Sequence, residues 1–263
     1  MPKAKPGLYA LYLRKSRADI DKERLGEFET LAKHEQELTA LAKRDGYALD
    51  VPYYKELVSG ERIADRHEFQ KMMQSIKGAE ISTAGFTDKT TKNNLDLVKW
   101  CENAYKNGWG YVYGGYGQVC TKQYLDQQAS LFPGNNEAGG EMRQVGEKWL
   151  GKRVCDCIGL IKSYAWYNAD SGEIVAGSNG FTDCGANSIW NNVTESGSIS
   201  SMPETPGLAV WMDGHIGVYI GNGEVIEAQG TAYGVVKTEL NGRGWTKWLK
   251  IPNIKYVNQS DKK

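Results

Sequence analysis

Cys157 has the residue type and the position of a nucleophile. It follows Asp156, a residue that caps helix starts well, and it precedes apolar residues at helical spacing. Cys157 is therefore predicted in the first turn of a helix, where unpaired backbone N–H groups and the positive end of the helix dipole stabilise a thiolate. The alternative is that Cys157 is a small buried core residue, as many cysteines are.

His215 is the candidate base. It stands at the start of a predicted strand, directly after an Asp213-Gly214 turn. Gly217 shares its face of the strand and leaves space beside the imidazole. A nucleophilic cysteine needs a base within hydrogen-bond reach, and the base needs a third polar group that fixes its tautomer. The alternative is a surface histidine without a catalytic role.

The third group depends on the register of the hairpin around Asn222-Gly223. A two-residue loop would put Glu227 on the strand face away from His215. A three-residue loop over Gly221–Gly223 with a bulge would put both Glu227 and Gln229 on the same face as His215. We expect the bulged register, in which either residue can orient the ring.

A helix and a set of strands must hold these candidates in place. After the helix that begins at Asp156, three strands with turn signals between them are predicted at Leu208–Met212, His215–Ile220 and Val225–Gln229. Residues 167–205 are expected to form a long connection rich in Ser, Asn and Gly. Upstream of Cys157, a helix is expected at Asn94–Tyr105 and a glycine and aromatic loop at 108–115.

Three segments around these residues carry a family resemblance. They are Asp156-Cys157-Ile158-Gly159-Leu160, the two strand segments 206–221 and 225–228, and Tyr111-Val-Tyr113-Gly114-Gly115. The first segment resembles the helix of NlpC/P60 cysteine peptidases that carries the nucleophile. The segments 206–221 and 225–228 resemble the strands of that family that carry the histidine and the third catalytic residue, and 111–115 resembles its aromatic Gly-Gly loop. Enzymes of that family cut peptidoglycan stem peptides.

The resemblance implies an α+β, papain-like domain over residues 94–254, with an antiparallel sheet and a helix-borne cysteine. It implies catalysis by Cys157 and His215, with Glu227 where the family commonly has a histidine, so that Gln229 stays open as the orienting residue. It leaves open whether the enzyme is an amidase or an endopeptidase.

Tyr111 and Asp156 are the expected substrate-binding residues, because Tyr111 matches the family position that flanks the thiol. The expected partners are peptidoglycan stem peptides, and no cofactor is expected. Cys155, Cys157, Cys184 and His215 could be combined into a zinc set. Their spacing lacks the paired C-x-x-C or H-x-x-x-H pattern of structural zinc sites, so we expect no metal.

Residues 1–78 are charge-dense and differ from the rest in composition. Strands near Leu8–Leu13 and Leu49–Val58 and helices near Glu27–Arg44 and Glu68–Ile76 form a β-α-β-α pattern, which implies a parallel strand pair joined by a crossover helix. Such a unit is small for a stable sheet, and its uncovered edge predicts poor order or self-association.

The segment Tyr12-Leu-Arg14-Lys-Ser16-Arg17, with Ser59–Arg66 downstream, resembles the start of the catalytic domain of large serine recombinases. Ser16 would match the nucleophile, and Arg14 a phosphate-binding arginine. The later arginine cluster of that family is not found, so we expect a truncated, α/β resolvase-like segment over 1–78 without recombinase activity. A linker is expected at 79–93 and a polar tail at 255–263.

Composition limits the function classes. The 263 residues hold 32 Lys+Arg and 32 Asp+Glu, so no global basic field attracts nucleic acid, and nucleic acid is not an expected partner. No apolar run approaches the ~20 residues of a membrane span. The start Met-Pro-Lys-Ala-Lys-Pro has no secretory signal, which predicts synthesis in the cytoplasm and action at the bacterial cell wall after release by another route. The oligomeric state stays open.

The sequence therefore predicts a peptidoglycan hydrolase similar to phage endolysins, which cleaves a stem-peptide amide by a Cys–His mechanism. Two alternatives from other classes stay open. One is a DNA-binding or recombinase-derived protein that acts through the N-terminal segment. The other is a wall-binding module that has lost turnover.

Overall fold

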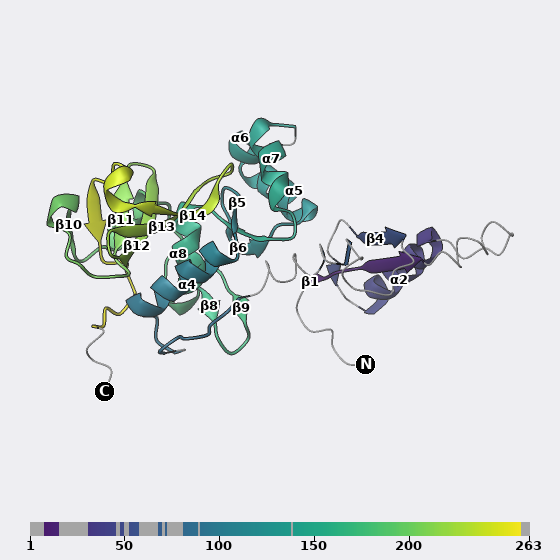
Figure 1. Ribbon diagram of the computed structural model, residues 1–263, viewed down its shortest axis with the longest axis horizontal. Coiled ribbons are helices and arrows are strands. Elements are labelled where there is room, and N and C mark those ends of the chain that lie inside the picture. The colour runs from purple at the N-terminus through teal and green to yellow at the C-terminus, as the bar shows by residue number, and fades with distance from the viewer. Residues whose placement is uncertain are drawn as a thin grey trace, which may run out of the picture. The chain divides into compact units, whose positions relative to one another are not determined.

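The computed structural model of the protein describes residues 8–15, 31–45, 48–49, 53–57, 68–69, 72, 81–88, 90–137 and 139–258. The chain divides into two compact units, Met1–Lys77 and Gly78–Lys263, and Figure 1 labels many of their helices and strands. Within the described ranges, no helix is both long enough and apolar enough to cross a membrane.

Parallel strand pairs and one long helix make up the described part of the first unit. Strand β1 (Leu8–Tyr9) pairs with β3 (Ala48–Leu49), and β2 (Tyr12–Lys15) pairs with β4 (Tyr54–Leu57), both in parallel. Helix α2 (Leu31–Asp45) connects the two sides in sequence. The predicted parallel pairing across a helix is confirmed, although the predicted strand Leu8–Leu13 is two short strands.

The residues that carry the recombinase resemblance lie largely outside the described part of the chain. Ser16 and the stretch 59–66 are not among the described residues, and of the second predicted helix only Glu68, Phe69 and Met72 are described, all helical. Arg14 is on β2 and is exposed. The resolvase-like character of this unit stays a prediction.

The second unit is built around a six-stranded sheet in which every pair of neighbours is antiparallel, in the order β10-β15-β11-β12-β13-β14. The strands are β10 (Ser196–Ser198), β11 (Ala209–Met212), β12 (His215–Gly221), β13 (Glu224–Gly230), β14 (Gly234–Glu239) and β15 (Lys247–Leu249). The three predicted strands and the antiparallel sheet are confirmed.

The prediction of a plain connection over 167–205 is wrong in part. This stretch holds β8 (Tyr167–Asn168), β9 (Glu173–Ile174) and the edge strand β10. Strands of two or three residues are too short to show an alternating apolar pattern, so nothing in the sequence marks them.

A second, smaller sheet leads the chain into the cysteine helix. It has the order β5-β7-β6, from β5 (Gly110–Tyr111), β7 (Arg153–Cys155) and β6 (Tyr116–Val119). The predicted loop 108–115 thus contains a short strand. Between β6 and β7 the chain forms three helices, α5 (Lys122–Leu131), α6 (Pro133–Asn136) and α7 (Glu141–Gly146).

Two helices cover one face of the six-stranded sheet, and both were predicted. Helix α4 (Asn94–Lys106) and helix α8 (Cys157–Ala165) pack on the sheet through one core cluster. That cluster joins Trp100, Ile161 and Tyr164 of the helices to Ile216, Val218, Ile226 and Ala228 of the strands. The opposite face of the sheet has its own cluster, with Leu208, Val210, Tyr219, Val225, Trp245 and Trp248.

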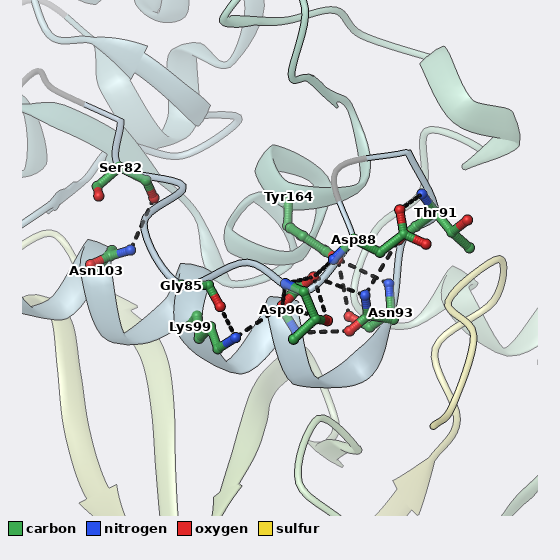
Figure 2. Close-up of polar contacts among 10 residues, drawn as sticks. Ser82, Gly85, Asp88, Thr91, Asn93, Asp96, Lys99, Asn103 and Tyr164 are labelled. Atoms are coloured by element: carbon green, nitrogen blue, oxygen red, sulfur yellow. Dashed lines mark hydrogen bonds and ion pairs between the residues drawn. The ribbon is translucent and has the colours of Figure 1, made fainter. Parts of the chain in front are cut away.

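A buried carboxylate fastens the segment before α4 to that helix (Figure 2). Asp96 is fully buried and accepts hydrogen bonds from the backbone N–H groups of Thr87 (2.8 Å) and Asp88 (2.9 Å) and from the Asn93 side chain (2.9 Å), while Lys99 lies at 3.3 Å. Burial acts to raise the pKa of Asp96, but these bonds outweigh it and hold the pKa below its usual value. The described residues of the stretch 79–93 are therefore packed onto α4.

The two ends of the described part of this unit also meet. Asn93 and Lys255 form a parallel bridge, and the backbone N–H of Asn94 donates to the Lys255 carbonyl at 3.0 Å. In return, the Lys255 N–H donates to the Lys92 carbonyl at 2.9 Å, and the Val257 N–H donates to Asn94 Oδ1 at 2.8 Å. We call residues 92–94 with 255–257 the terminal seam.

Candidate active site

The N-terminus of helix α8 holds Cys157 in a fixed position. Asp156 caps the helix, as predicted, by accepting a hydrogen bond from the Gly159 N–H at 2.6 Å through Oδ1. Its other oxygen accepts from the Gly114 N–H at 2.9 Å, and its own N–H donates to the Gly115 carbonyl at 2.9 Å. Asp156 thus joins the cysteine helix to the glycine and aromatic loop.

Gly159 is required for this junction. A Cβ atom at residue 159 would lie 1.8 Å from the Gly115 carbonyl oxygen, so the helix and the loop approach each other more closely than any side chain permits. Glycine at position 159 is therefore required by the packing of helix α8 against the aromatic loop.

The Cys157 thiol lies against the turn that precedes His215. Its Sγ is 4.0 Å from the Gly214 carbonyl oxygen, and the backbone N–H groups of Ile158 and Ile216 face the sulfur. Burial, helped by the Asp156 charge, raises the pKa of Cys157 to about 12, although those N–H groups act in the opposite direction. At neutral pH the free protein therefore holds a thiol, and a base must remove its proton.

His215 and Glu227 form a direct pair. His215 Nε2 lies 2.6 Å from Glu227 Oε2, and Glu227 is 0% exposed. Because an ionised carboxylate can only accept, Nε2 carries the hydrogen, which leaves Nδ1 as the basic nitrogen. Gln229, the other candidate, also lies on β13, but the hydrogen-bond partner of the His215 ring is Glu227.

The hairpin register explains this pairing and corrects one expectation. Val218 pairs with Ile226 and Tyr219 with Val225, which is the predicted bulged register with Glu227 on the face of His215. The extra residue, however, lies within β12 between Tyr219 and Gly221, and the loop has two residues rather than three. The reason is that Asn222 and Gly223 both take positive φ (55° and 75°), which closes a two-residue turn.

Three further residues surround the pair, and the sequence analysis missed them. Thr238 Oγ1 donates to Glu227 Oε1 at 2.8 Å, and Arg243 binds both carboxylate oxygens at 2.7 and 2.8 Å. The Trp245 ring stacks on the imidazole of His215 with centroids 5.5 Å apart and an interplanar angle of 13°. Burial acts to raise the pKa of Glu227, but the bonds from His215, Arg243 and Thr238 outweigh it and lower the pKa to about 2.

A buried carboxylate needs a counter-charge, so a cation near Glu227 could have been expected on physical grounds. Nothing in the spacing identifies Arg243 as that cation, because it follows β14, a strand without a clear sequence signal. Gly217 gave a partial signal for Trp245. A Cβ there would lie 2.8 Å from Val225 Cγ1 and 3.3 Å from both Glu227 Cβ and the Trp245 ring, so this tryptophan is one of three side chains that fill the space beside the imidazole.

Residues 137–253 match the model of the NlpC/P60 family. This part of the chain is an NlpC/P60 domain. The match includes Cys157, His215 and Glu227, together with the six-stranded sheet and helix α8. The predicted α+β NlpC/P60 fold is confirmed, and Tyr111 lies before the matched residues.

Three solved structures resemble the chain over most of their own lengths. The NlpC/p60 domain of the peptidoglycan hydrolase SagA is 14% identical and aligns over 60% of this chain and 99% of its own, with a TM-score of 0.34. The peptidoglycan hydrolase RipB from Mycobacterium tuberculosis is 16% identical over 74% of this chain and 88% of its own (TM-score 0.36). The P60 domain of the M. avium subspecies paratuberculosis antigen MAP1204 is 20% identical over 61% and 96% (TM-score 0.33). No curated protein matches the chain.

A cavity of about 640 Å³ opens next to Cys157 in the NlpC/P60 domain. Asp156 and Ile158, the two neighbours of Cys157, line it. The rest of its wall comes from the aromatic loop, strand β6, helices α5 and α8 and the connection after α8, and includes Tyr113, Tyr116, Tyr124, Gln128, Lys162, Asp183 and Ser188.

The two predicted substrate-binding residues, Tyr111 and Asp156, have different surroundings in the structure. Tyr111 lies close to the thiol, and burial together with the nearby Cys157 raises the pKa of its hydroxyl. Asp156 lines the cavity, but both of its oxygens accept backbone hydrogen bonds. Within the described part of the chain, no group of three His, Cys, Asp or Glu residues could hold a metal ion.

Proposed function

We propose that the NlpC/P60 domain is a peptidoglycan hydrolase that cleaves an amide bond of the stem peptide with Cys157 as nucleophile. The observation that carries the proposal is the His215–Glu227 pair, which starts directly after the turn that the Cys157 thiol contacts. A thiol, a base beside it and a buried carboxylate behind the base make up the set that nucleophilic cysteine catalysis requires.

The geometry supports the following sequence of steps. Nδ1 of His215 takes the proton from the Cys157 thiol, and the sulfur attacks the carbonyl carbon of the scissile amide. The Cys157 N–H, at the start of α8, donates to the oxyanion of the tetrahedral intermediate. The imidazolium then gives its proton to the leaving amine as the C–N bond breaks. Finally, water hydrolyses the thioester, which releases the acid and restores the thiol.

Glu227 supports both proton transfers without entering the bond changes. Its ionised carboxylate holds the hydrogen of His215 on Nε2, so that Nδ1 faces the reaction, and it stabilises the imidazolium that forms. We further propose that the enzyme acts at the bacterial cell wall, in the manner of an endolysin, and that the cavity beside Cys157 receives the stem peptide.

The test is the release of fragments from purified peptidoglycan, identified by mass spectrometry. The wild-type protein should release stem-peptide fragments, Cys157→Ala should release none, and Glu102→Gln should behave like wild type, because Glu102 forms a surface pair with Lys106 on α4. The fragments identify the bond that is cut. If the folded wild-type protein sediments with peptidoglycan and releases nothing, the domain is a binding module and the proposal is wrong.

A further inference from the structure

The Glu227 carboxylate has four donors, two for each oxygen. Oε1 accepts from Thr238 Oγ1 (2.8 Å) and Arg243 Nε (2.7 Å), and Oε2 accepts from His215 Nε2 (2.6 Å) and Arg243 Nη2 (2.8 Å). A carboxylate has about four lone-pair sites, so all of them are used. The bidentate fork of Arg243 fixes the plane of the carboxylate as well as its distance.

Two groups that can carry positive charge, His215 and Arg243, bind the Glu227 carboxylate. In the described part of the chain, the charged or titratable groups bonded to Glu227 are His215 from β12 and Arg243 from the segment after β14. Cys157 Sγ lies 4.0 Å from the carbonyl oxygen of Gly214, the residue before His215, and Asp156 and Tyr111 lie close to the sulfur. An imidazolium at His215 would therefore share the single charge of Glu227 with the guanidinium.

This sharing affects how readily His215 works as a base. A buried carboxylate without a second cation would favour the protonated imidazole, and a histidine that is already protonated cannot take the proton of a thiol. A cation on the same carboxylate works against that protonation.

We propose that Arg243 is a positioning residue that fixes the Glu227 carboxylate toward His215 and shares its charge, which disfavours the imidazolium and favours the imidazole that accepts the Cys157 proton. The inference rests on the proposed Cys–His mechanism. Arg243 contacts neither the thiol nor the reacting atoms, and it acts only through Glu227.

The test titrates His215 by NMR in the full chain and, in parallel, measures the rate of Cys157 alkylation by iodoacetamide against pH. Arg243→Gln should raise the titration midpoint of His215 by about one pH unit or more, since a neighbouring charge within 4–6 Å shifts a pKa by about 1–3 units. The pH at which the alkylation rate reaches half of its maximum should increase by the same amount. Arg243→Lys, which keeps the charge, should shift both less than Arg243→Gln does.

Lys237→Gln is the matched control, because Lys237 lies beside Thr238 on β14 and pairs with Glu224 at 2.7 Å rather than with Glu227. It should leave the midpoint where it is in the wild type. A folded Arg243→Gln protein with an unchanged midpoint would overturn the proposal and reduce Arg243 to a structural counter-ion.

If Arg243→Gln does not fold, a second pair of variants decides. In Glu227→Gln the guanidinium is unbalanced and should hold the His215 midpoint at least about one pH unit below that of Glu227→Gln/Arg243→Gln. Equal midpoints in these two variants would contradict the proposal. Neither readout uses peptidoglycan, so a failure of the wild-type protein to cleave it would disprove the proposed function without deciding the role of Arg243.

Discussion

In the proposed mechanism the Cys157 thiol depends on His215 to remove its proton, because burial raises the thiol pKa to about 12. A group whose pKa is raised is almost entirely protonated at neutral pH, so the uncoupled thiolate fraction grows tenfold for each pH unit up to that value. We predict that alkylation of Cys157 by iodoacetamide at pH 7 is about 100-fold slower in His215→Ala than in the wild type. In that variant the rate should still rise steadily through pH 10.

Both proteins should carry Cys184→Ala, so that the half-buried Cys184 does not contribute to the signal, and the modified peptide should be identified by mass. Equal rates at pH 7 would mean that the imidazole does not assist the thiol.

Glu227 and Gln229 can be separated by matched amide substitutions. Glu227→Gln should lower kcat/KM on peptidoglycan by about 10²-fold or more, because the amide no longer fixes the tautomer of His215. It should also cost about 1–3 kcal/mol of unfolding free energy, since Arg243 loses its partner but can regain water. Gln229→Ala should change both quantities little. A large loss of kcat/KM in Gln229→Ala together with a small loss in Glu227→Gln would assign the orienting role to Gln229.

At the scale of elements, the contact between α8 and the aromatic loop depends on the absence of a side chain at residue 159. We predict that Gly159→Ala lowers the unfolding free energy by about 2–4 kcal/mol in urea denaturation, because the methyl group would overlap the Gly115 carbonyl. Gly134→Ala is the control. Gly134 lies in helix α6 with open space around it, so this change should leave stability unchanged or raise it by up to about 1 kcal/mol. Similar losses in both variants would contradict the close approach at 159.

The Asp96 carboxylate is the second element-scale test. Asp96→Asn should cost about 3 kcal/mol of unfolding free energy, because the amide places donors against the N–H groups of Thr87 and Asp88. Glu102→Gln on the same helix, in a loose surface pair with Lys106, should change it by less than about 0.5 kcal/mol.

The pH dependence of stability gives an independent readout for Asp96. Its pKa is lowered in the folded protein, so its stabilising contribution is complete above the ordinary aspartate range and is lost as the pH falls below that range. The gap in unfolding free energy between wild type and Asp96→Asn should therefore narrow between about pH 4 and pH 2. A gap that is constant over this interval would exclude a charge effect.

Elements with a strong local signal could be predicted from the sequence. The cap at Asp156, the apolar spacing of α8 and the turn signals around β12 each act within a few residues, and each is confirmed. The short strands β5 and β10 were missed because their pairing comes from distant partners rather than from local pattern, and β8 was missed because two residues show no alternation. Cys157 and His215 could be named as candidates in advance for the same local reasons, whereas the choice between Glu227 and Gln229 stayed open. Arg243 and Trp245 could not, since only the closed sheet brings them to Glu227 and His215.

At the scale of the whole molecule, every residue assigned here to the catalytic machinery lies in the unit Gly78–Lys263. That unit has its own core on both faces of the six-stranded sheet. We predict that residues 78–263, produced without 1–77, fold cooperatively and keep the peptidoglycan-cleaving activity of the full chain within about twofold. Circular dichroism melts and fragment release would be compared for the two proteins. A 78–263 protein that folds but has lost activity would mean that the first unit contributes to catalysis.

The terminal seam determines how the second unit responds to mechanical load. Residues 92–94 and 255–257 run in parallel and are joined by backbone hydrogen bonds from Asn94 to Lys255 and from Lys255 to Lys92. Tension applied through the two ends of the unit would pull these segments in opposite directions along their length. The bonds of the seam would then have to break together in shear rather than open one after another. The strands that carry His215 and Glu227 lie between the two segments of the terminal seam in the chain. They would therefore bear no load, and the candidate active site would keep its geometry, until the hydrogen bonds of the seam break.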